Sequence, residues 1–282
     1  MLSSLRPRHE GDGLFSPSPF ARRIAVRPGT RFAGAIEGNR RFGPRDTVLV
    51  LCTEEGRMDM ANGTRFATGN HPVELLFPLM HLDAAGYDFR VLTPTGRPVA
   101  IEEWAMPRGD AATMDFRARH EDRLRTPGSA ADFIARGMPD ATRVAAVFVP
   151  GGHGAMLGLP FDRNIGEVLL WAHGAQRLTL AICHGPAAFL SMRLAGAFPY
   201  AGYSIAAFPD RADRIAPMAG YLPGPMPWYF NARLRHAGMR IVNHLPTGRC
   251  HRDRRLITGD SPEAANTFGR MAAEALLDAD SA

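Results

Sequence analysis

Residues 177–190 read RLTLAICHGPAAFL, and this stretch joins two kinds of local pattern. The run RLTLAIC (177–183) is short, apolar and β-branched in character, which predicts a buried strand. The residues after it are rich in Ala and Leu, and Pro186 suits the first position of a helix. Cys183 therefore lies at the turn between a strand and a helix.

The place of Cys183 bears on its chemistry. Backbone N–H groups at the start of a helix carry partial positive charge, which favours a thiolate over a thiol. Such a thiolate could act as a nucleophile. The alternative is a small, inert core residue, as most isolated cysteines are. The stretch alone leaves both interpretations open.

Short apolar runs of the same kind recur along the chain, with helical stretches between several of them. This alternation predicts an α/β fold in which a mostly parallel sheet is covered by helices on both faces. The expected strands are 47–52, 89–93, 145–150, 178–183, 204–208 and 255–259, and the expected helices are 71–86, 131–138, 166–175, 186–196 and 262–278.

The first 45 residues differ from the rest, because they are rich in Pro, Gly, Ser and Arg and show no sustained periodicity. We expect 1–45 to form an arm that wraps the body or a partner, and 46–282 to form the α/β domain. The start of the chain is charged where a signal peptide would be apolar, and no later apolar run approaches the about 18 residues of a membrane span. We therefore expect a cytoplasmic protein with no membrane partner.

All 33 basic side chains are arginines, since the chain contains no lysine. Lysine Schiff-base enzymes and P-loop nucleotidases are therefore excluded, because both need a lysine. The formal net charge is +5, and the arginines are interleaved with acids, as in RARHEDRLR (117–125). This mixture predicts a solvated mixed-charge face rather than a groove for nucleic acid.

The other two cysteines, Cys52 and Cys250, form no CxxC pair with each other or with Cys183. An odd set of three without such a pair indicates neither a disulfide framework nor a cysteine-rich zinc site. We interpret Cys52 and Cys250 as structural.

A nucleophilic thiolate needs a group that moves protons and donors for a developing oxyanion, and both kinds of group follow expected strands. Gly151 and Gly152 come after the strand 145–150 and could supply backbone N–H donors, although a tight turn explains them equally well. Glu74 is the third residue of a helix that Pro72 would begin, so its carboxyl would lie at the same edge of the sheet as Cys183. The alternative is a glutamate that merely stabilises the start of the helix.

His184 adjoins the cysteine and could be a general base or a ring fixed by one hydrogen bond. Asp213 would be its natural orienting partner. The residues themselves do not decide whether the two meet.

Several segments taken together resemble the HchA-type heat-shock proteins, the glyoxalase III and deglycase branch of the DJ/PfpI superfamily. The resemblance runs from residue 46 to the C-terminus with the motifs in order, and the arm matches poorly. It implies a flavodoxin-like three-layer sandwich with a small cap, formed by insertions around 95–130 and 214–235, and a homodimer. The segments are ATGNHPVELLFPLMHLDAAGYDF (67–89), EEWAMP (102–107), AAVFVPGGHGAMLGLP (145–160), ICHGPAAFL (182–190), GYSIAAFPDRAD (202–213) and RRLITGDSPEAAN (254–266).

The resemblance assigns roles position by position. The family's nucleophile falls on Cys183, its neighbouring histidine on His184, the acid of that triad on Asp213, and the carboxyl partner of the thiol on Glu74. It implies a stress-response enzyme, a lyase or hydrolase, that needs no cofactor. Its substrates would be α-oxoaldehydes such as methylglyoxal, or early glycation adducts on proteins or nucleotides, and its products lactate or glycolate. Free aldehydes and adducts stay open as the main substrate.

The family's His/Glu/His zinc site matches Asp83, Asp88 and His120 here. Two aspartates and one imidazole can hold a divalent cation, but they are harder ligands than zinc prefers. The alternative is a set of solvated surface acids.

Two other functions are weighed against this one. The first is a holdase chaperone that binds unfolded proteins, because YLPGPMPWYF (221–230) crowds apolar residues into an expected loop. The second is a PfpI-like cysteine peptidase or amidase, which shares the Cys-His pair but lacks the arm and the cap insertions. A class I glutamine amidotransferase is disfavoured, because Ala181 replaces the first glycine of its typical elbow and no His-x-Glu follows.

Overall fold

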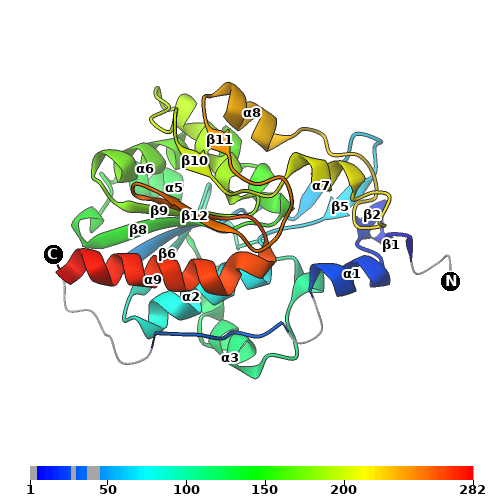
Figure 1. The fold of residues 1–282 in the computed structure, drawn as a ribbon, viewed down its shortest axis with the longest axis horizontal. Helices are drawn as coiled ribbons and strands as arrows, with labels where there is room; N and C mark the ends of the chain where they lie inside the picture. Colours follow the sequence, from blue (N-terminus) through cyan, green and yellow to red (C-terminus); the bar gives the residue numbers. More distant parts are fainter. Residues whose placement is uncertain (1–4, 27–29, 37–44, 282) are drawn as a thin grey trace.

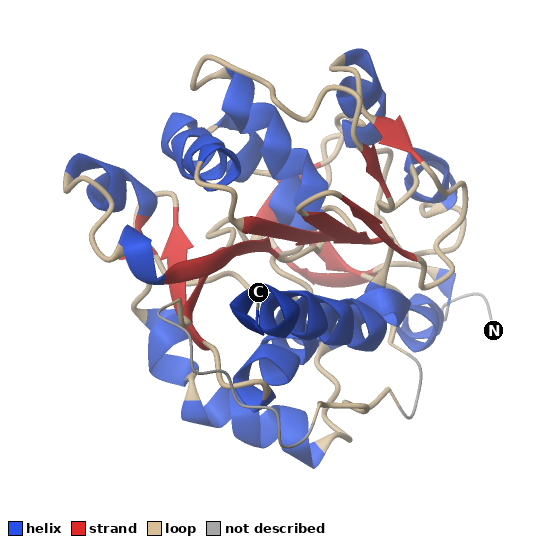
Figure 2. Cartoon of the chain, turned by 60° about the vertical axis from the view of Figure 1, so that its left-hand side comes forward, coloured by secondary structure: helices blue, strands red, loops and turns tan. Residues whose placement is uncertain are grey.

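The computed structural model describes residues 5–26, 30–36 and 45–281, and a parallel sheet runs through the middle of the molecule (Figures 1 and 2). Seven strands of the described chain form this sheet in the order β12-β13-β9-β8-β3-β6-β7. Every neighbouring pair is parallel except β12 and β13. The strands are β3 (Thr47–Leu51), β6 (Asp88–Thr93), β7 (Gly128–Ser129), β8 (Val144–Val149), β9 (Leu178–Ile182), β12 (Cys250–Asp253) and β13 (Leu256–Gly259).

Helices cover the sheet on both faces, as Figure 2 shows. Successive side chains of β3 enter opposite layers, because side chains of a strand alternate between the two faces. Val48 and Val50 pack with the helices on one face, whereas Leu49 and Leu51 pack with those on the other. The first face carries α2 (Pro72–Ala84), α3 (Ala111–Arg119), α4 (Glu121–Arg125) and α9 (Ala265–Ser281), and the second carries α5 (Ala130–Ala135), α6 (Arg163–Gly174), α8 (Phe230–His236) and the 3₁₀ helix η6 (Gly185–Arg193).

Part of the expected arm joins a second sheet beside the first. The strand β2 runs parallel to β5, with Leu14 opposite Arg65 and Phe15 opposite Phe66. The helix α1 follows, with the Ser18 side chain accepting from the backbone N–H of Ala21 at its start (3.1 Å). Residues 1–4, 27–29 and 37–44 of the expected arm lie outside the described residues. The elements are β1 (Arg8–Gly11), β2 (Leu14–Ser16), α1 (Pro19–Ala25), β4 (Arg57–Asp59) and β5 (Arg65–Ala67).

The predicted α/β class with a mostly parallel sheet is confirmed, but the strand expected at 204–208 is wrong in length and place. Its strand part is β10 (Ser204–Ile205), which pairs with β11 (Arg240–Ile241) away from the main sheet. The backbone N–H groups of Ala206 and Ala207 donate to the side chains of Thr258 (2.9 Å) and Asn243 (3.0 Å). These side-chain acceptors replace the neighbouring strand that a longer β10 would need.

The helix after Cys183 also differs from its prediction. It is a 3₁₀ helix that begins at Gly185, so Pro186 is its second residue rather than its first. A Cβ at Gly185 would lie 2.5 Å from the carbonyl oxygen of Val149, and this close approach fixes the first residue as glycine. The remaining elements are α7 (Asp210–Ile215) and the 3₁₀ helices η2 (Glu103–Ala105), η3 (Ala141–Arg143), η4 (His153–Met156), η5 (Leu159–Phe161) and η7 (Pro262–Ala264).

Within the residues that the structure describes, no helix is both long enough and apolar enough to cross a lipid bilayer.

Candidate active site

Cys183 stands on a strained turn at the carboxyl end of β9. Its φ is 59°, in the left-handed region that residues other than glycine rarely adopt. Two backbone hydrogen bonds hold it there: its N–H donates to Gly259 (2.8 Å) and its carbonyl accepts from Phe208 (2.9 Å). Such a conformation costs about 1–3 kcal/mol and is concentrated at functional sites. The turn exposes the thiol to a pocket while its backbone stays fixed.

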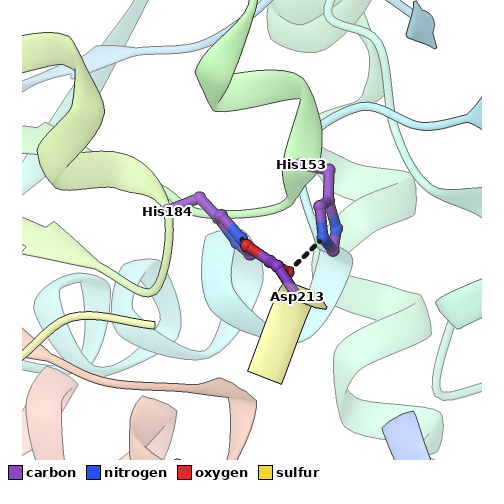
Figure 3. Close-up of side chains that lie close together, drawn as sticks. All are labelled: His153, His184 and Asp213. Atoms are coloured by element: carbon purple, nitrogen blue, oxygen red, sulfur yellow. Dashed lines mark hydrogen bonds and ion pairs between the residues drawn. The ribbon is translucent and has the colours of Figure 1, made fainter. Parts of the chain in front are cut away.

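Two histidines share the carboxylate of Asp213 (Figure 3). His184 contacts Asp213 through Nε2 and Oδ2 at 3.0 Å, and its Nδ1 lies 3.3 Å from the sulfur of Cys183. His153 contacts the other carboxylate oxygen, Oδ1, also at 3.0 Å. Because a carboxylate only accepts hydrogen bonds, the Nε2 atom of His184 carries a proton. In the neutral ring, Nδ1 is then an acceptor aimed at the thiol.

The pKa values of Asp213, His153 and His184 are shifted in different directions. Burial would raise the pKa of Asp213, but His184 and His153 together hold it well below its usual range. Burial would lower the pKa of His153, but Asp213 and Glu102 raise it. For His184, burial and the charge of His153 lower the pKa. These effects favour the positive charge on His153 and a neutral ring at His184, whose Nδ1 could then accept the proton of the thiol.

Glu74 and Cys183 face each other across Gly151. A Cβ added at Gly151 would lie 2.2 Å from Oε2 of Glu74 and 2.6 Å from the Cβ of Cys183. Glu74 is the third residue of α2, as the sequence predicts. Neither of its carboxyl oxygens makes a hydrogen bond of good geometry within the described chain, although the thiol of Cys183 and the N–H of Gly152 lie close enough to lower its pKa. The carboxyl is therefore free to exchange a proton with a molecule in the pocket.

Burial favours the protonated form of both groups. Burial raises the pKa of Glu74 well above its usual value, while the thiol of Cys183 acts in the opposite direction. Burial and then the neighbouring carboxyl raise the pKa of Cys183 well above that of a free thiol. The expectation that the start of a helix favours the thiolate is therefore wrong for the resting site, because burial outweighs it.

Gly152 is the backbone donor of the site. Its N–H lowers the pKa of both Cys183 and Glu74, since it stabilises their charged forms. Its φ is +96°, and a Cβ there would lie 2.3 Å from the carbonyl oxygen of Gly69. Gly151 accepts instead, from the N–H of His71 (3.0 Å). Gly152 is thus placed to hold an oxyanion, and Gly151 provides the space between thiol and carboxyl.

These groups open into a cavity of about 220 Å³ whose walls are mostly apolar. Ala21 and Ile24 of α1 line it, so the described part of the arm forms one wall. Ala25 also belongs to α1, and the other lining residues come mostly from the edge of the sheet and from the segment around α7: His71, Glu74, Glu102, Gly152, His153, Cys183, His184, Phe208, Ala212, Asp213, Ile215, Ala216, Ala219, Tyr221, Pro246, Pro262 and Glu263.

Several titratable residues of this cavity were not predicted, and His153, His71 and Glu102 are among them. His153 directly follows Gly152 after β8, so the edge-of-sheet argument could have found it. His71 is 3% exposed, and burial followed by the charges of His153 and His184 lowers its pKa to about 3. Glu102 lies in EEWAMP, which reads as a loop, and burial raises its pKa to about 7. No local sequence pattern marks His71 or Glu102 as part of the site.

The three residues matched to a zinc site do not form one. Asp88 is in an ion pair with Arg123 (2.5 Å), and Asp83 is exposed on α2. His120 packs edge-on against Phe89, with ring centroids 4.9 Å apart. Across the described ranges, the ligand atoms that gather within 4.8 Å of one another belong to His153, His184 and Asp213 instead. The residues at the matched positions therefore do not fit zinc.

Proteins of known name resemble the chain over almost its whole length. It is 43% identical over 266 residues to "Protein/nucleic acid deglycase HchA" of Escherichia coli O157:H7, covering 94% of this chain and 93% of that protein. The values are the same for "Protein/nucleic acid deglycase 1" of Escherichia coli strain K12. No protein-family model matches the chain.

Solved structures show the same fold at lower identity. Rapid Encystment Protein 24 kDa of Francisella tularensis aligns with a TM-score of 0.69 at 20% identity, over 82% of this chain and 99% of that one. Glyoxalase III from Candida albicans aligns with a TM-score of 0.63 at 19% identity, over 81% of this chain and 97% of that one. These alignments support the flavodoxin-like architecture.

Proposed function

The chain belongs to the HchA deglycase family of the DJ/PfpI superfamily, and from this premise we propose that it is a glyoxalase III or deglycase that uses Cys183 as nucleophile. It acts on α-oxoaldehydes such as methylglyoxal, or on their early adducts with amines and thiols, without a cofactor. The observation that carries the proposal is the approach of Cys183 and Glu74 across Gly151, with His184 beside the thiol in the same small cavity.

The first step is attack on the aldehyde carbon. The thiol of Cys183 gives its proton to Nδ1 of His184, 3.3 Å away, as the sulfur–carbon bond forms. Asp213 accepts the Nε2 proton of His184, which fixes the tautomer and stabilises the imidazolium that results. The N–H of Gly152 stabilises the oxyanion of the hemithioacetal.

The second step moves a proton between two carbons. Glu74 first gives its resting proton to the oxyanion of the hemithioacetal. As carboxylate it then removes the proton from the carbon bound to sulfur, while the imidazolium of His184 protonates the ketone oxygen, which gives an enediol. Glu74 then returns the proton to the neighbouring carbon, so that a hemithioacetal with a ketone becomes a thioester with a hydroxyl group. The raised pKa of Glu74 suits this work, because it makes the carboxylate a stronger base. Water then releases lactate from methylglyoxal, or glycolate from glyoxal, and restores the thiol.

The walls of the cavity favour a small carbonyl compound. Methylglyoxal has few atoms and one polar end, and a mostly apolar cavity of about 220 Å³ suits such a molecule. Excluding water also strengthens each electrostatic interaction at the reacting carbons.

The direct test is conversion of methylglyoxal to lactate without glutathione, followed by proton NMR. We expect the purified chain to form lactate, and Cys183→Ser and Glu74→Gln to lose about 100-fold or more in kcat/KM. Cys250→Ser is the matched control, because this thiol lies in β12 outside the cavity, and we expect it to keep full activity. Undiminished turnover in Cys183→Ser would refute the mechanism.

The chaperone hypothesis loses its main support in the structure. Leu222, Met226 and Phe230 are buried in the core, and Tyr221 lines the cavity. The segment 221–230 therefore reaches the cavity through Tyr221 and packs other apolar side chains into the core, and we do not propose it as a binding face for unfolded proteins.

A further inference from the structure

A second buried carboxyl, Glu102, lines the cavity and has no part in the steps above. It precedes η2 and is 1% exposed. Its Oε1 accepts two hydrogen bonds, from the hydroxyl of Thr68 (2.9 Å) and from the backbone N–H of His153 (3.3 Å). Its Oε2 has no partner in the part of the chain that the structure describes. The two oxygens of this carboxyl are therefore in different environments.

This asymmetry fixes where a proton resides. Two donors already occupy Oε1, so a proton bound to the carboxyl resides on Oε2. Burial raises the pKa of Glu102 to about 7, against the opposing effect of His153. The group is thus half protonated near neutral pH, which is the condition in which a carboxyl works best as a general acid.

Glu102 and Cys183 line the same cavity and both face the segment 152–153. The N–H of His153 binds Glu102, and the N–H of the preceding residue, Gly152, acts on Cys183 and Glu74. Consecutive peptide groups therefore hold the two carboxyls and the thiol around one cavity. A molecule attached to the sulfur would therefore occupy a cavity that both carboxyls line.

We propose that Glu102 is the general acid that protonates the departing nitrogen when the substrate is an adduct of an α-oxoaldehyde with an amine. The inference rests on the proposed function, and adds to it the group that lets the site accept nitrogen adducts. Such an adduct is a carbinolamine, in which one carbon carries a hydroxyl group and the amine nitrogen.

The step balances without any co-reactant. The carbon–nitrogen bond breaks and its electron pair stays on nitrogen, which takes the proton from Oε2 of Glu102. The carbinol oxygen forms the carbonyl, and its proton returns to the Glu102 carboxylate. The products are the free amine and the free aldehyde, and the aldehyde then reacts with Cys183 as described.

Leaving-group chemistry explains why the acid matters for one class of adduct only. An amine cannot depart as an anion, so its nitrogen must be protonated as the bond breaks. A thiol with a pKa of about 8.5 departs as thiolate without that help. Glu102 should therefore set the preference of the enzyme between nitrogen and sulfur adducts.

The experiment compares two preformed methylglyoxal adducts, one with N-acetyl-lysine and one with N-acetyl-cysteine. Wild type, Glu102→Gln and Glu103→Gln are assayed by NMR for adduct loss above the spontaneous rate. Gln keeps an acceptor for Thr68 and His153 but has no acidic proton. Glu103 is the matched control, because it is the adjacent acid and half exposed, outside the cavity.

We expect Glu102→Gln to lower the ratio of amine-adduct to thiol-adduct turnover by about 100-fold, and Glu103→Gln to leave this ratio unchanged. If Glu102→Gln keeps the wild-type ratio of amine-adduct to thiol-adduct turnover, whether both rates are unchanged or both fall by the same factor, the proposal is overturned. In the wild type, amine-adduct turnover should also fall as the pH rises through about 7, because the acid form of Glu102 disappears, whereas thiol-adduct turnover should not. A shared pH profile contradicts the assignment even if the variant fails to fold.

Failure of this inference is distinguishable from failure of the proposed function. Wild type that forms lactate from free methylglyoxal, but consumes the amine adduct no faster than it dissociates by itself, overturns the role of Glu102 alone. Wild type that converts neither free methylglyoxal nor either adduct contradicts the proposed function itself.

Discussion

Gly151→Ala should disable the site through a single methyl group. The added carbon would lie 2.2 Å from Oε2 of Glu74 and 2.6 Å from both the Cβ of Cys183 and the carbonyl oxygen of Ile182, whereas ordinary contact begins at 3.4 Å. The last two neighbours belong to β9 and its turn and cannot rotate away. Glu74 must therefore retreat by about 1 Å, a displacement that costs about 100-fold in rate at a reacting centre. Inserting a methyl group into a packed interior typically lowers the free energy of unfolding by about 1–3 kcal/mol. We expect about 3 kcal/mol for Gly151→Ala, because three atoms lie closer than 3.0 Å to the added carbon.

Two measurements check this prediction. Lactate formation from methylglyoxal gives kcat/KM, and urea unfolding gives the free energy of unfolding. Gly109→Ala is the matched control, because a Cβ there meets no atom within 4 Å among the described residues and its φ lies outside the left-handed region. We expect the control to keep activity and stability. Wild-type turnover in Gly151→Ala would refute the idea that Glu74 and Cys183 act across this glycine.

Three further predictions follow from the charges of the site. Asp213→Asn should lower kcat/KM by about 100- to 10,000-fold, because an amide cannot accept from both histidines and His184 loses its tautomer; wild-type kinetics would contradict this. His153→Gln should move the acidic limb of the kcat/KM profile to higher pH, because it removes the charge that lowers the pKa of His184; an unmoved limb would argue against it. Glu102→Gln should gain stability over wild type as the pH rises from 4.5 to 7, since a carboxyl whose pKa is raised on folding loses its contribution over that range. The difference between 4.5 and about 7 corresponds to about 3 kcal/mol, and urea unfolding at several pH values measures it.

The central strands were predictable because their sequences match a simple physical rule. Strands covered on both faces must be apolar at successive positions, and TVLVL, VAAVFV and LTLAI stand out for that reason. The end of the expected strand at 204–208 was not predictable. The groups that bind its backbone, Thr258 and Asn243, lie far away in sequence.

The site was predictable where it depends on local position. Cys183 and Glu74 each follow a strand and begin a helix, so the edge-of-sheet argument placed both at the same edge. The pairing of His184 with Asp213 depends on a contact between distant segments, and the family resemblance rather than any local pattern pointed to it. The structure brings all four together, and their catalytic roles stay predictions.

One error has an electrostatic cause. The thiolate expected at Cys183 is disfavoured in the resting site, because the sequence does not reveal how deeply the helix start is buried. The residues matched to a zinc site by resemblance, which surface acids explain as well, do not bring their ligand atoms within 4.8 Å of one another, and Arg123 holds Asp88 in an ion pair. The homodimer and the cytoplasmic location also stay predictions.

The most direct test of the account is a crystal structure of Glu74→Gln soaked with methylglyoxal. This variant can still form the hemithioacetal but cannot move the proton onward, so the covalent intermediate should accumulate. We predict continuous density from the sulfur of Cys183 to the aldehyde carbon, with the oxygen of that carbon at hydrogen-bond distance from the N–H of Gly152. A soaked crystal with an unmodified Cys183, or with the adduct on another residue, would contradict the claim that this thiol is the nucleophile.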